Sequence, residues 1–247
     1  TLHGAERLRD HDASANLMPE PLTYYYFGGP ISEAVAAVRE ARGGLGHVAA
    51  VGLGTGSLAC HRRAEEAWTF YEIDPEVVRI ARDPNMFSFL TTCTPEATVV
   101  VGDARLTLSA SAQRYGLIVL DAFSSDAIPV HLLTREALAG YLARLAPGGV
   151  IVMHISNRHM ELGRVVAAVA AAEGLVTYLK QDDRPDAQPP DFKMNAIVAA
   201  LARNPADLGD LPQRAGWREV KPEARIAAWT DDYSDILGAI LRKKLGW

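Results

Sequence analysis

The chain has 247 residues, of which 49% are hydrophobic, and a formal net charge of -5. This length and composition are sufficient for a substantial core in one large domain. The acidic balance excludes an overall basic surface, so we expect no nucleic-acid partner. Cys60 and Cys93 are the only cysteines. Two cysteines are too few for a disulfide framework or a cysteine-rich zinc site, which favours a reducing compartment.

The sequence contains no apolar run of membrane-spanning length and no visible secretory signal. We therefore expect a soluble, cytoplasmic chain. The first residue is Thr1 rather than a methionine, which leaves open that the chain is part of a longer protein.

The first 30 residues are irregular, because proline and glycine interrupt an aromatic cluster at residues 24–27. A helical pattern follows, for which Ser32 is a candidate N-terminal cap. We expect this helix to end at Gly43 and Gly44.

Beyond this helix, apolar runs typical of strands alternate with helical patterns. The clearest later helix spans about 134–145, and Pro147-Gly148-Gly149 is expected to end it. Alternation of this kind predicts an α/β fold with a mostly parallel, doubly wound sheet, in which ligands bind at the carboxyl ends of the strands. The expected strands are 47–51, 68–73, 98–101, 117–121 and 149–155.

A glycine-rich turn, Gly52-Leu53-Gly54-Thr55-Gly56, follows the first expected strand. Glycines let the backbone approach a ligand, and the N–H groups of a following helix would face it. Glu72 ends the next strand, where a carboxylate is suited to two ribose hydroxyls. The spacing G-x-G-x-G with later strand-end acids suits an adenosine sulfonium compound better than a dinucleotide.

Three further acids follow strands. Asp74 precedes Pro75 and is best interpreted as a helix cap. Asp103 could accept a hydrogen bond from an adenine amine, and Asp121 directly follows the run Leu117–Leu120. Any one of these acids could simply cap a helix or lie in a solvated turn, but together they favour a nucleoside site.

An ordered set of motifs resembles the spermidine synthase, or aminopropyltransferase, family, and more closely its bacterial branch that is often fused to membrane segments. The motifs are Thr1-Leu2-His3-Gly4, Pro21-Leu22-Thr23-Tyr24-Tyr25, Val51 to Gly56, Tyr71-Glu72-Ile73-Asp74, Gly102-Asp103-Ala104, Asp121 to Asp126, His154 to Arg158, and Trp229 to Ser234.

The resemblance implies a Rossmann-like class I methyltransferase-type fold. It implies that residues 1–30 are a remnant of an N-terminal β region and cleft wall, and that 31–247 form the catalytic domain. It also implies a homodimer. For the full-length protein it leaves two alternatives, a soluble protein or one in which this chain is fused to membrane segments.

For function, the resemblance implies transfer of an aminopropyl group from decarboxylated S-adenosylmethionine, or a relative, to a polyamine. Asp121 would accept an amine proton, with Asp126 as a second catalytic acid. The cofactor-binding residues would be Gly52, Gly54, Thr55, Gly56, Glu72 (ribose), Asp103 (adenine) and Ala104. The substrate-binding residues would be Tyr24, Tyr25, His154, Asp231 and Asp232. No metal is expected, because His154 and His159 lack an established metal-ligand pattern.

Two departures from the family pattern keep other functions open. Thr55 stands where the family usually has an acid, and four residues rather than two separate Asp121 from Asp126. A methyltransferase that uses intact S-adenosylmethionine is therefore an alternative, and a cofactor- or polyamine-sensing module is another.

Overall fold

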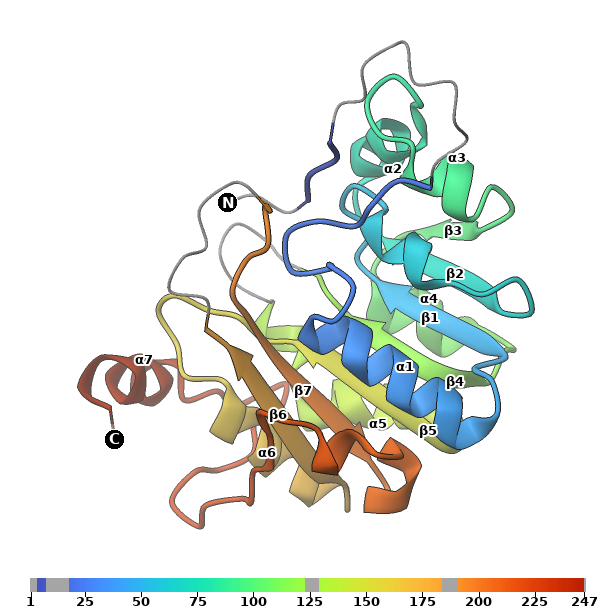
Figure 1. The fold of residues 1–247 in the computed structure, drawn as a ribbon. Helices are drawn as coiled ribbons and strands as arrows, with labels where there is room; N and C mark the ends of the chain where they lie inside the picture. The colour runs from blue at the N-terminus through green and yellow to red at the C-terminus, as the bar shows by residue number, and fades with distance from the viewer. Residues whose placement is uncertain (1–3, 8–17, 123–128, 184–190, 247) are drawn as a thin grey trace.

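The structure is a computed structural model that describes residues 4–7, 18–122, 129–183 and 191–246. Among these residues, eight strands form one sheet in the order β3-β2-β1-β4-β5-β7-β6-β8 (Figure 1). The parallel part consists of β1 (His47–Val51), β2 (Ala67–Glu72), β3 (Thr98–Val101), β4 (Tyr115–Leu120) and β5 (Leu145–His154). The antiparallel part consists of β7 (Ala196–Ala202), β6 (Val176–Asp182) and β8 (Trp217–Glu219). The predicted α/β fold with a mostly parallel sheet is confirmed.

Alternate residues of each central strand face opposite sides of the sheet. Val48 and Ala50 of β1 belong to one hydrophobic cluster, whereas Ala49 and Val51 belong to another. Every residue of β4 is buried. A strand that is covered on both faces needs a continuous apolar run, which is the pattern that residues 115–120 supply.

Helices cover both faces of the sheet (Figure 1). One face packs against α1 (Pro30–Arg42), η1 (Ser57–His61), α2 (Pro75–Arg82) and α3 (Phe89–Cys93). The other packs against α4 (Ala104–Ala110), α5 (Arg135–Arg144), α6 (Gly163–Ala172) and α7 (Ile236–Leu245). Short 3-10 helices complete the chain at η2 (Val130–Leu132), η3 (Pro205–Leu208) and η4 (Leu211–Gln213).

Helix α1 begins differently from the sequence prediction. Its N-terminal cap is Gly29, with Pro30 in the first turn and no side chain capping the helix. The Ser32 hydroxyl instead accepts a hydrogen bond from the backbone N–H of Gly28 at 3.2 Å. The proposed Ser32 cap is therefore wrong, because the helix starts earlier, at a proline whose missing N–H needs no partner. The predicted end is correct, since Gly43 adopts φ of 67° as the C-terminal cap.

The connection from α5 to β5 also differs from expectation. The side chain of Thr134 caps α5, and β5 begins at Leu145, directly after the last helical residue. Pro147-Gly148-Gly149 therefore lies inside β5 rather than forming the helix stop. The pairing of β4 with β5 shifts register between Tyr115 and Leu117. Such an irregularity tolerates a proline that cannot donate to the ladder.

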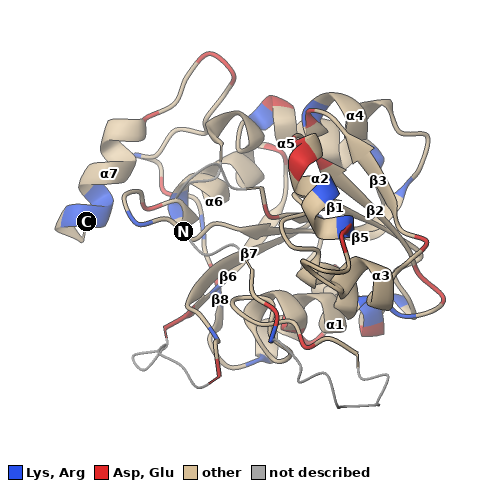
Figure 2. Cartoon of the chain, turned by 90° about the horizontal axis from the view of Figure 1, so that it is seen from above, with Lys and Arg blue, Asp and Glu red and all other residues tan. Residues whose placement is uncertain are grey.

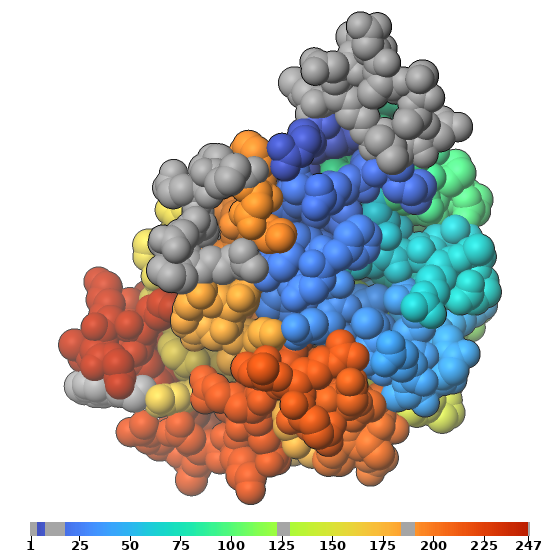
Figure 3. Space-filling model, in the orientation of Figure 1, coloured from blue at the N-terminus to red at the C-terminus, as the bar shows by residue number. Residues whose placement is uncertain are grey.

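The segment before α1 lies against the chain that leads into β7. Thr23 donates its backbone N–H to the carbonyl of Phe192 at 2.8 Å and accepts from the N–H of Met194 at 3.1 Å. Figure 3 shows the blue atoms before α1 beside the orange atoms of the segment before β7. This contact fixes the buried side chains of Tyr24 and Tyr25 over the end of the sheet.

Cys60 in η1 and Cys93 in α3 form a disulfide across 33 residues of sequence. The small number of cysteines favoured a reducing compartment, and this disulfide does not support that inference. Their number gave no indication of pairing, because only the packing of η1 against α3 brings them to a Cα–Cα distance of 4.9 Å.

Helix α7 buries the side chain of Ala239 and carries its cations at its last turn. Arg242, Lys243 and Lys244 form the blue end of this helix in Figure 2. None of the helices in the described part of the chain combines the length and apolar character of a membrane span.

Candidate functional site

A cavity of about 440 Å³ lies at the carboxyl ends of the parallel strands. Residues that follow β1, β2, β3 and β4 converge on it, as the topology of a parallel sheet requires. Glu72, Asp103 and Asp121, which lie far apart in sequence, all line it. The remaining lining residues are Tyr24, Tyr25, Val51, Gly52, Gly54, Tyr71, Ile73, Val77, Gly102, Ala104, Ala122, Pro129, His131 and Leu132.

The glycine turn directly after β1 forms part of the cavity wall. Gly52 has φ of 94°, a conformation that favours glycine, and a Cβ at this position would meet the backbone carbonyl of Asp121. Gly54 also lines the cavity. The turn continues into the short 3-10 helix η1 rather than into the expected α-helix, so the helix terminus itself offers a weaker anion site than the sequence suggested.

Thr55 and Gly56 serve the turn and are not among the residues lining the cavity. The Thr55 hydroxyl lies 2.8 Å from that of Ser57, and the Thr55 side chain packs against Gly4. Gly56 has φ of 86° and faces Leu90 of α3. These contacts explain both residues as structural supports of the glycine turn.

The carboxylate of Glu72 is buried and fixed by two backbone donors. The N–H of Leu53 donates to Oε2 at 2.9 Å, and the N–H of Asp74 donates to Oε1 at 3.0 Å. Each oxygen keeps a second lone pair for a ligand hydroxyl. Asp74 itself caps α2 by accepting from the N–H of Glu76 at 2.8 Å, which confirms the prediction for that residue.

Asp103 both caps a helix and lines the cavity. Its Oδ1 accepts from the N–H of Arg105 at 2.8 Å and caps α4, while the residue also lines the cavity beside Ala104. Helix capping and cavity lining are therefore not exclusive at this position. The cap holds one carboxylate oxygen in place, and the other remains available to a ligand donor.

Asp121 is the centre of a buried hydrogen-bonded chain. The Tyr25 hydroxyl donates to Asp121 Oδ2, and His154 Nδ1 lies 2.7 Å from Oδ1. Burial, followed by the negative charge of Asp121, raises the pKa of Tyr25 well above its ordinary value, so its hydroxyl stays protonated and donates. Tyr24 packs on Tyr25 with ring centroids 4.4 Å apart.

His154 does not occupy the place expected for a substrate-binding residue. Its side chain is only 3% exposed and is not among the cavity-lining residues, so it lies behind Asp121 rather than in the cleft. Its Nε2 lies 2.7 Å from the Ser156 hydroxyl, whose oxygen accepts the N–H of Ile197 at 2.9 Å. The strand end that positions His154 was predictable, but its direction depends on the antiparallel strand beside it.

Asp231 also lies outside the cavity lining. The Arg105 guanidinium contacts both its carboxylate oxygens, at 2.9 and 2.8 Å, and the Thr134 hydroxyl donates to it at 2.7 Å. These contacts, with that of Arg105 first, lower the pKa of Asp231. Asp231 therefore ties the C-terminal turn to α4 and α5, while the adjacent Asp232 is exposed and likewise absent from the lining. Asp126 lies outside the described residues.

Several lining residues were not predicted. Tyr71 and Ile73 flank Glu72, the last residue of β2, so their position at the strand end was a usable signal. Val77, Pro129, His131 and Leu132 come from α2 and from the segment before α5, whose approach to the cavity depends on how these segments pack. Phe27, the last residue of the aromatic cluster at 24–27, does not line the cavity; it is exposed and packs edge-on against His61.

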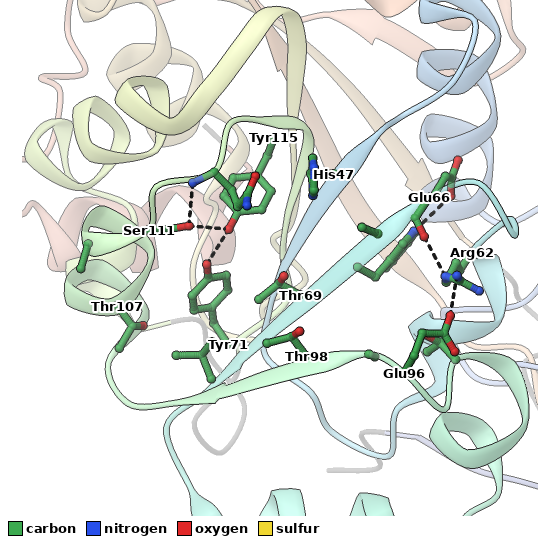
Figure 4. A pocket seen from close by; sticks show the side chains of 17 residues that line it. His47, Arg62, Glu66, Thr69, Tyr71, Glu96, Thr98, Thr107, Ser111 and Tyr115 are labelled. Atoms are coloured by element: carbon green, nitrogen blue, oxygen red, sulfur yellow. Dashed lines mark hydrogen bonds and ion pairs between the residues drawn. The ribbon is translucent and has the colours of Figure 1, made fainter.

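A second cavity of about 610 Å³ lies between α4 and strands β1 to β3 (Figure 4). The Tyr71 and Tyr115 hydroxyls lie 2.7 Å apart there, and Ser111 lies 2.9 Å from Tyr115. Apart from Tyr71, its lining residues differ from those of the first cavity. The size of a cavity therefore does not identify the candidate site, because the converging strand-end acids all belong to the smaller one.

Comparisons with solved structures define the class of fold. The structure superposes on a probable spermidine synthase from Corynebacterium glutamicum with a TM-score of 0.58 and 17% identity, covering 83% of this chain and 80% of that one. It also superposes on human methyltransferase-like protein 13 in complex with SAH, with a TM-score of 0.52 and 19% identity, covering 70% of this chain and 78% of that one. The chain has a class I methyltransferase-type fold.

A sequence comparison also matches part of the chain to a curated relative. Over 108 residues the chain is 36% identical to the polyamine aminopropyltransferase of Vibrio vulnificus strain CMCP6, and the match covers 41% of this chain and 35% of the relative. The chain thus matches about a third of that relative's length. No family model matches the sequence. The predicted resemblance to spermidine synthases is confirmed by this relative and by the structural similarity.

Proposed function

We propose that the chain is an aminopropyltransferase, which moves an aminopropyl group from decarboxylated S-adenosylmethionine to a polyamine acceptor. The negative charge of the cavity is the main observation that supports this proposal. Three carboxylates line it, those of Glu72, Asp103 and Asp121, and its described lining residues include neither lysine nor arginine. A cavity of this charge favours cationic ligands.

The two candidate cofactors differ in the charge that this cavity would meet. Both carry a sulfonium and an ammonium group, but the intact compound also carries a carboxylate. In a partly buried site, a ligand carboxylate near Asp121 would lack a positive partner among the described lining residues. The anionic cavity therefore supports the decarboxylated compound as the ligand.

The buried acid at the end of β4 supplies the proton chemistry that the reaction requires. An alkylamine has a pKa near 10.4, so it arrives protonated and cannot attack until it loses a proton. Asp121 would attract the ammonium and accept that proton as the nitrogen bonds to the carbon beside the sulfur. The carbon–sulfur bond breaks with its electron pair remaining on sulfur. Tyr24 and Tyr25 would flank the cation with aromatic faces.

The remaining polar groups fit an adenosine moiety. Glu72 is held with free lone pairs toward ribose hydroxyls, and Asp103 offers its uncapped oxygen to a donor such as the adenine amine. Gly52 and Gly54 permit close backbone approach. When bound, the sulfonium supplies a good leaving group, so positioning of the two reactants would account for much of the rate.

Methyl transfer from intact S-adenosylmethionine is the second candidate. The observation in its favour is Thr55, which is neutral and packs under Gly4, so it adds no acid near the ammonium of the donor. One of the structurally similar proteins is also a methyltransferase-like protein in complex with SAH. Both candidates use the same nucleoside site but differ in the donor and in the group transferred.

Calorimetric titration of the purified chain with each donor separates the two. Aminopropyl transfer predicts tighter binding of the decarboxylated compound and formation of methylthioadenosine when diamines or polyamines are added. Tighter binding of the intact compound, with methylated product, would support methyl transfer. Binding of either donor without turnover on a panel of amines and methyl acceptors would leave a sensing function as the better explanation.

A further inference from the structure

The imidazole of His154 connects the candidate acid Asp121 to the antiparallel half of the sheet. Nδ1 lies 2.7 Å from Asp121 Oδ1, and Nε2 lies 2.7 Å from Ser156 Oγ. The side chains of His154 and Asp121 are each only 3% exposed. The ring is therefore held at both nitrogens, away from the cavity that Asp121 lines.

The surroundings select one tautomer of this ring. An ionised carboxylate can only accept, so the hydrogen bond between His154 Nδ1 and Asp121 Oδ1 is donated by Nδ1. Ser156 Oγ, which also accepts the N–H of Ile197 at 2.9 Å, then donates its proton to His154 Nε2. A neutral imidazole that accepts at Nε2 carries its proton on Nδ1. That proton points at Asp121 Oδ1, while Tyr25 donates to Oδ2.

The position of this assembly comes from three separate parts of the chain. His154 is the last residue of β5 and pairs with Val198 of β7, which places Ile197 beside Ser156. The ring of Tyr24 packs on the imidazole with centroids 4.2 Å apart. Asp121, which lines the cavity, is thus held on one oxygen by Tyr25 and on the other by His154.

We propose that His154, as the neutral tautomer protonated at Nδ1, is a positioning residue that orients the Asp121 carboxylate toward the attacking amine. This inference rests on the proposed function, because the amine is the ligand that Asp121 would receive. It assigns His154 an effect on turnover and none on binding of the nucleoside. The Asp121 carboxylate selects this tautomer, and Ser156, which accepts the N–H of Ile197, complements it by donating to Nε2.

The tautomer can be measured without any catalytic assay. In long-range ¹H–¹⁵N spectra of the full chain, the His154 signals are assigned by their loss in His154→Asn. The expected spectrum at neutral pH shows a protonated Nδ1 and an unprotonated Nε2. A spectrum with the proton on Nε2, or on both nitrogens, overturns the proposal.

Turnover then tests the positioning role with a matched pair of variants. The side-chain amide of His154→Asn places a nitrogen donor near the position of Nδ1, whereas His154→Leu fills the site without a donor. We expect kcat to fall about 100-fold in His154→Leu, the effect of a misplaced catalytic group. We expect His154→Asn to retain most of the turnover and both variants to bind methylthioadenosine as the unchanged protein does.

Thermal melting and methylthioadenosine titration show whether each variant is folded. Equal loss of kcat in the two variants overturns the positioning role, because the donor then makes no difference. If the unchanged protein forms no methylthioadenosine with any amine, the proposed function fails. In that case the imidazole spectrum still decides whether His154 holds Asp121 through Nδ1.

Discussion

A Cβ on Gly52 would clash with the backbone carbonyl of Asp121. The first residue of the glycine turn and the candidate catalytic acid are therefore in direct backbone contact across β1 and β4. We predict that Gly52→Ala lowers the free energy of unfolding by at least about 2 kcal/mol, because a positive φ and an added clash both oppose the alanine. Urea unfolding would measure the loss.

Gly28→Ala is the matched control for this substitution. Gly28 has φ of 87°, close to the 94° of Gly52, but a Cβ there would meet nothing within 4 Å. Its cost should therefore reflect the backbone conformation alone, about 1–2 kcal/mol. If the two variants lose equal stability, the clash with Asp121 adds nothing to the cost of a side chain at residue 52.

Removing the charge of Asp121 should separate chemistry from binding. We predict that Asp121→Asn lowers kcat by about 10² to 10⁴-fold, the range for loss of a general base, while methylthioadenosine affinity changes little. Asp231→Asn is the control, because it removes a carboxylate that is paired with Arg105 outside the cavity. Unchanged turnover in Asp121→Asn would remove Asp121 from the mechanism.

The buried imidazole of His61 predicts a specific dependence of stability on pH. Its Nε2 lies 2.7 Å from the carbonyl of Tyr25, and burial, with a smaller effect from Arg39, lowers its pKa to about 4 from the ordinary 6.5. Below pH 6.5 the unfolded chain gains a proton that the folded chain does not. Stability is therefore lost as pH falls from 6.5 to 4, by about 3 kcal/mol in total.

Replacement by a residue that does not titrate checks this sign. Gln in His61→Gln can still donate to the Tyr25 carbonyl, so the variant should keep much of its stability at pH 7 and lose the His61 contribution to the slope. Urea midpoints at several pH values between 7 and 4 compare the two proteins. Parallel pH profiles would show that His61 does not cause the acid loss.

The disulfide between Cys60 and Cys93 should stabilise the packing of η1, which follows the glycine turn, against α3. Closing a loop of this sequence separation contributes about 3–4 kcal/mol in the chain-entropy model. Reduction should therefore lower the melting temperature of the unchanged protein, whereas Cys60→Ser with Cys93→Ser should melt at one temperature with or without reductant. Melting that is insensitive to reductant in the unchanged protein would argue against this bond.

The amino-acid sequence by itself determined the parallel half of the sheet and the ends of its strands. Continuous apolar runs such as residues 117–120 can be buried on both faces only in such a sheet, and the acids after them must then meet at one edge. For this reason the sequence alone predicts that Glu72, Asp103 and Asp121 lie together. Local rules were also sufficient for Asp74 as a cap and Gly43 as a helix end.

Only the tertiary structure decided what each polar group faces. The sequence could not show that His154 lies behind Asp121 or that Asp231 pairs with Arg105, because both depend on segments distant in the chain. For the same reason the sequence did not indicate three other features. These are strands β6 and β7, the packing of Thr55 against Gly4, and the pairing of Cys60 with Cys93. Periodicity and turn preferences report a residue's own neighbourhood, whereas hydrogen-bond direction and side-chain burial depend on the packing of elements that the chain brings together from afar.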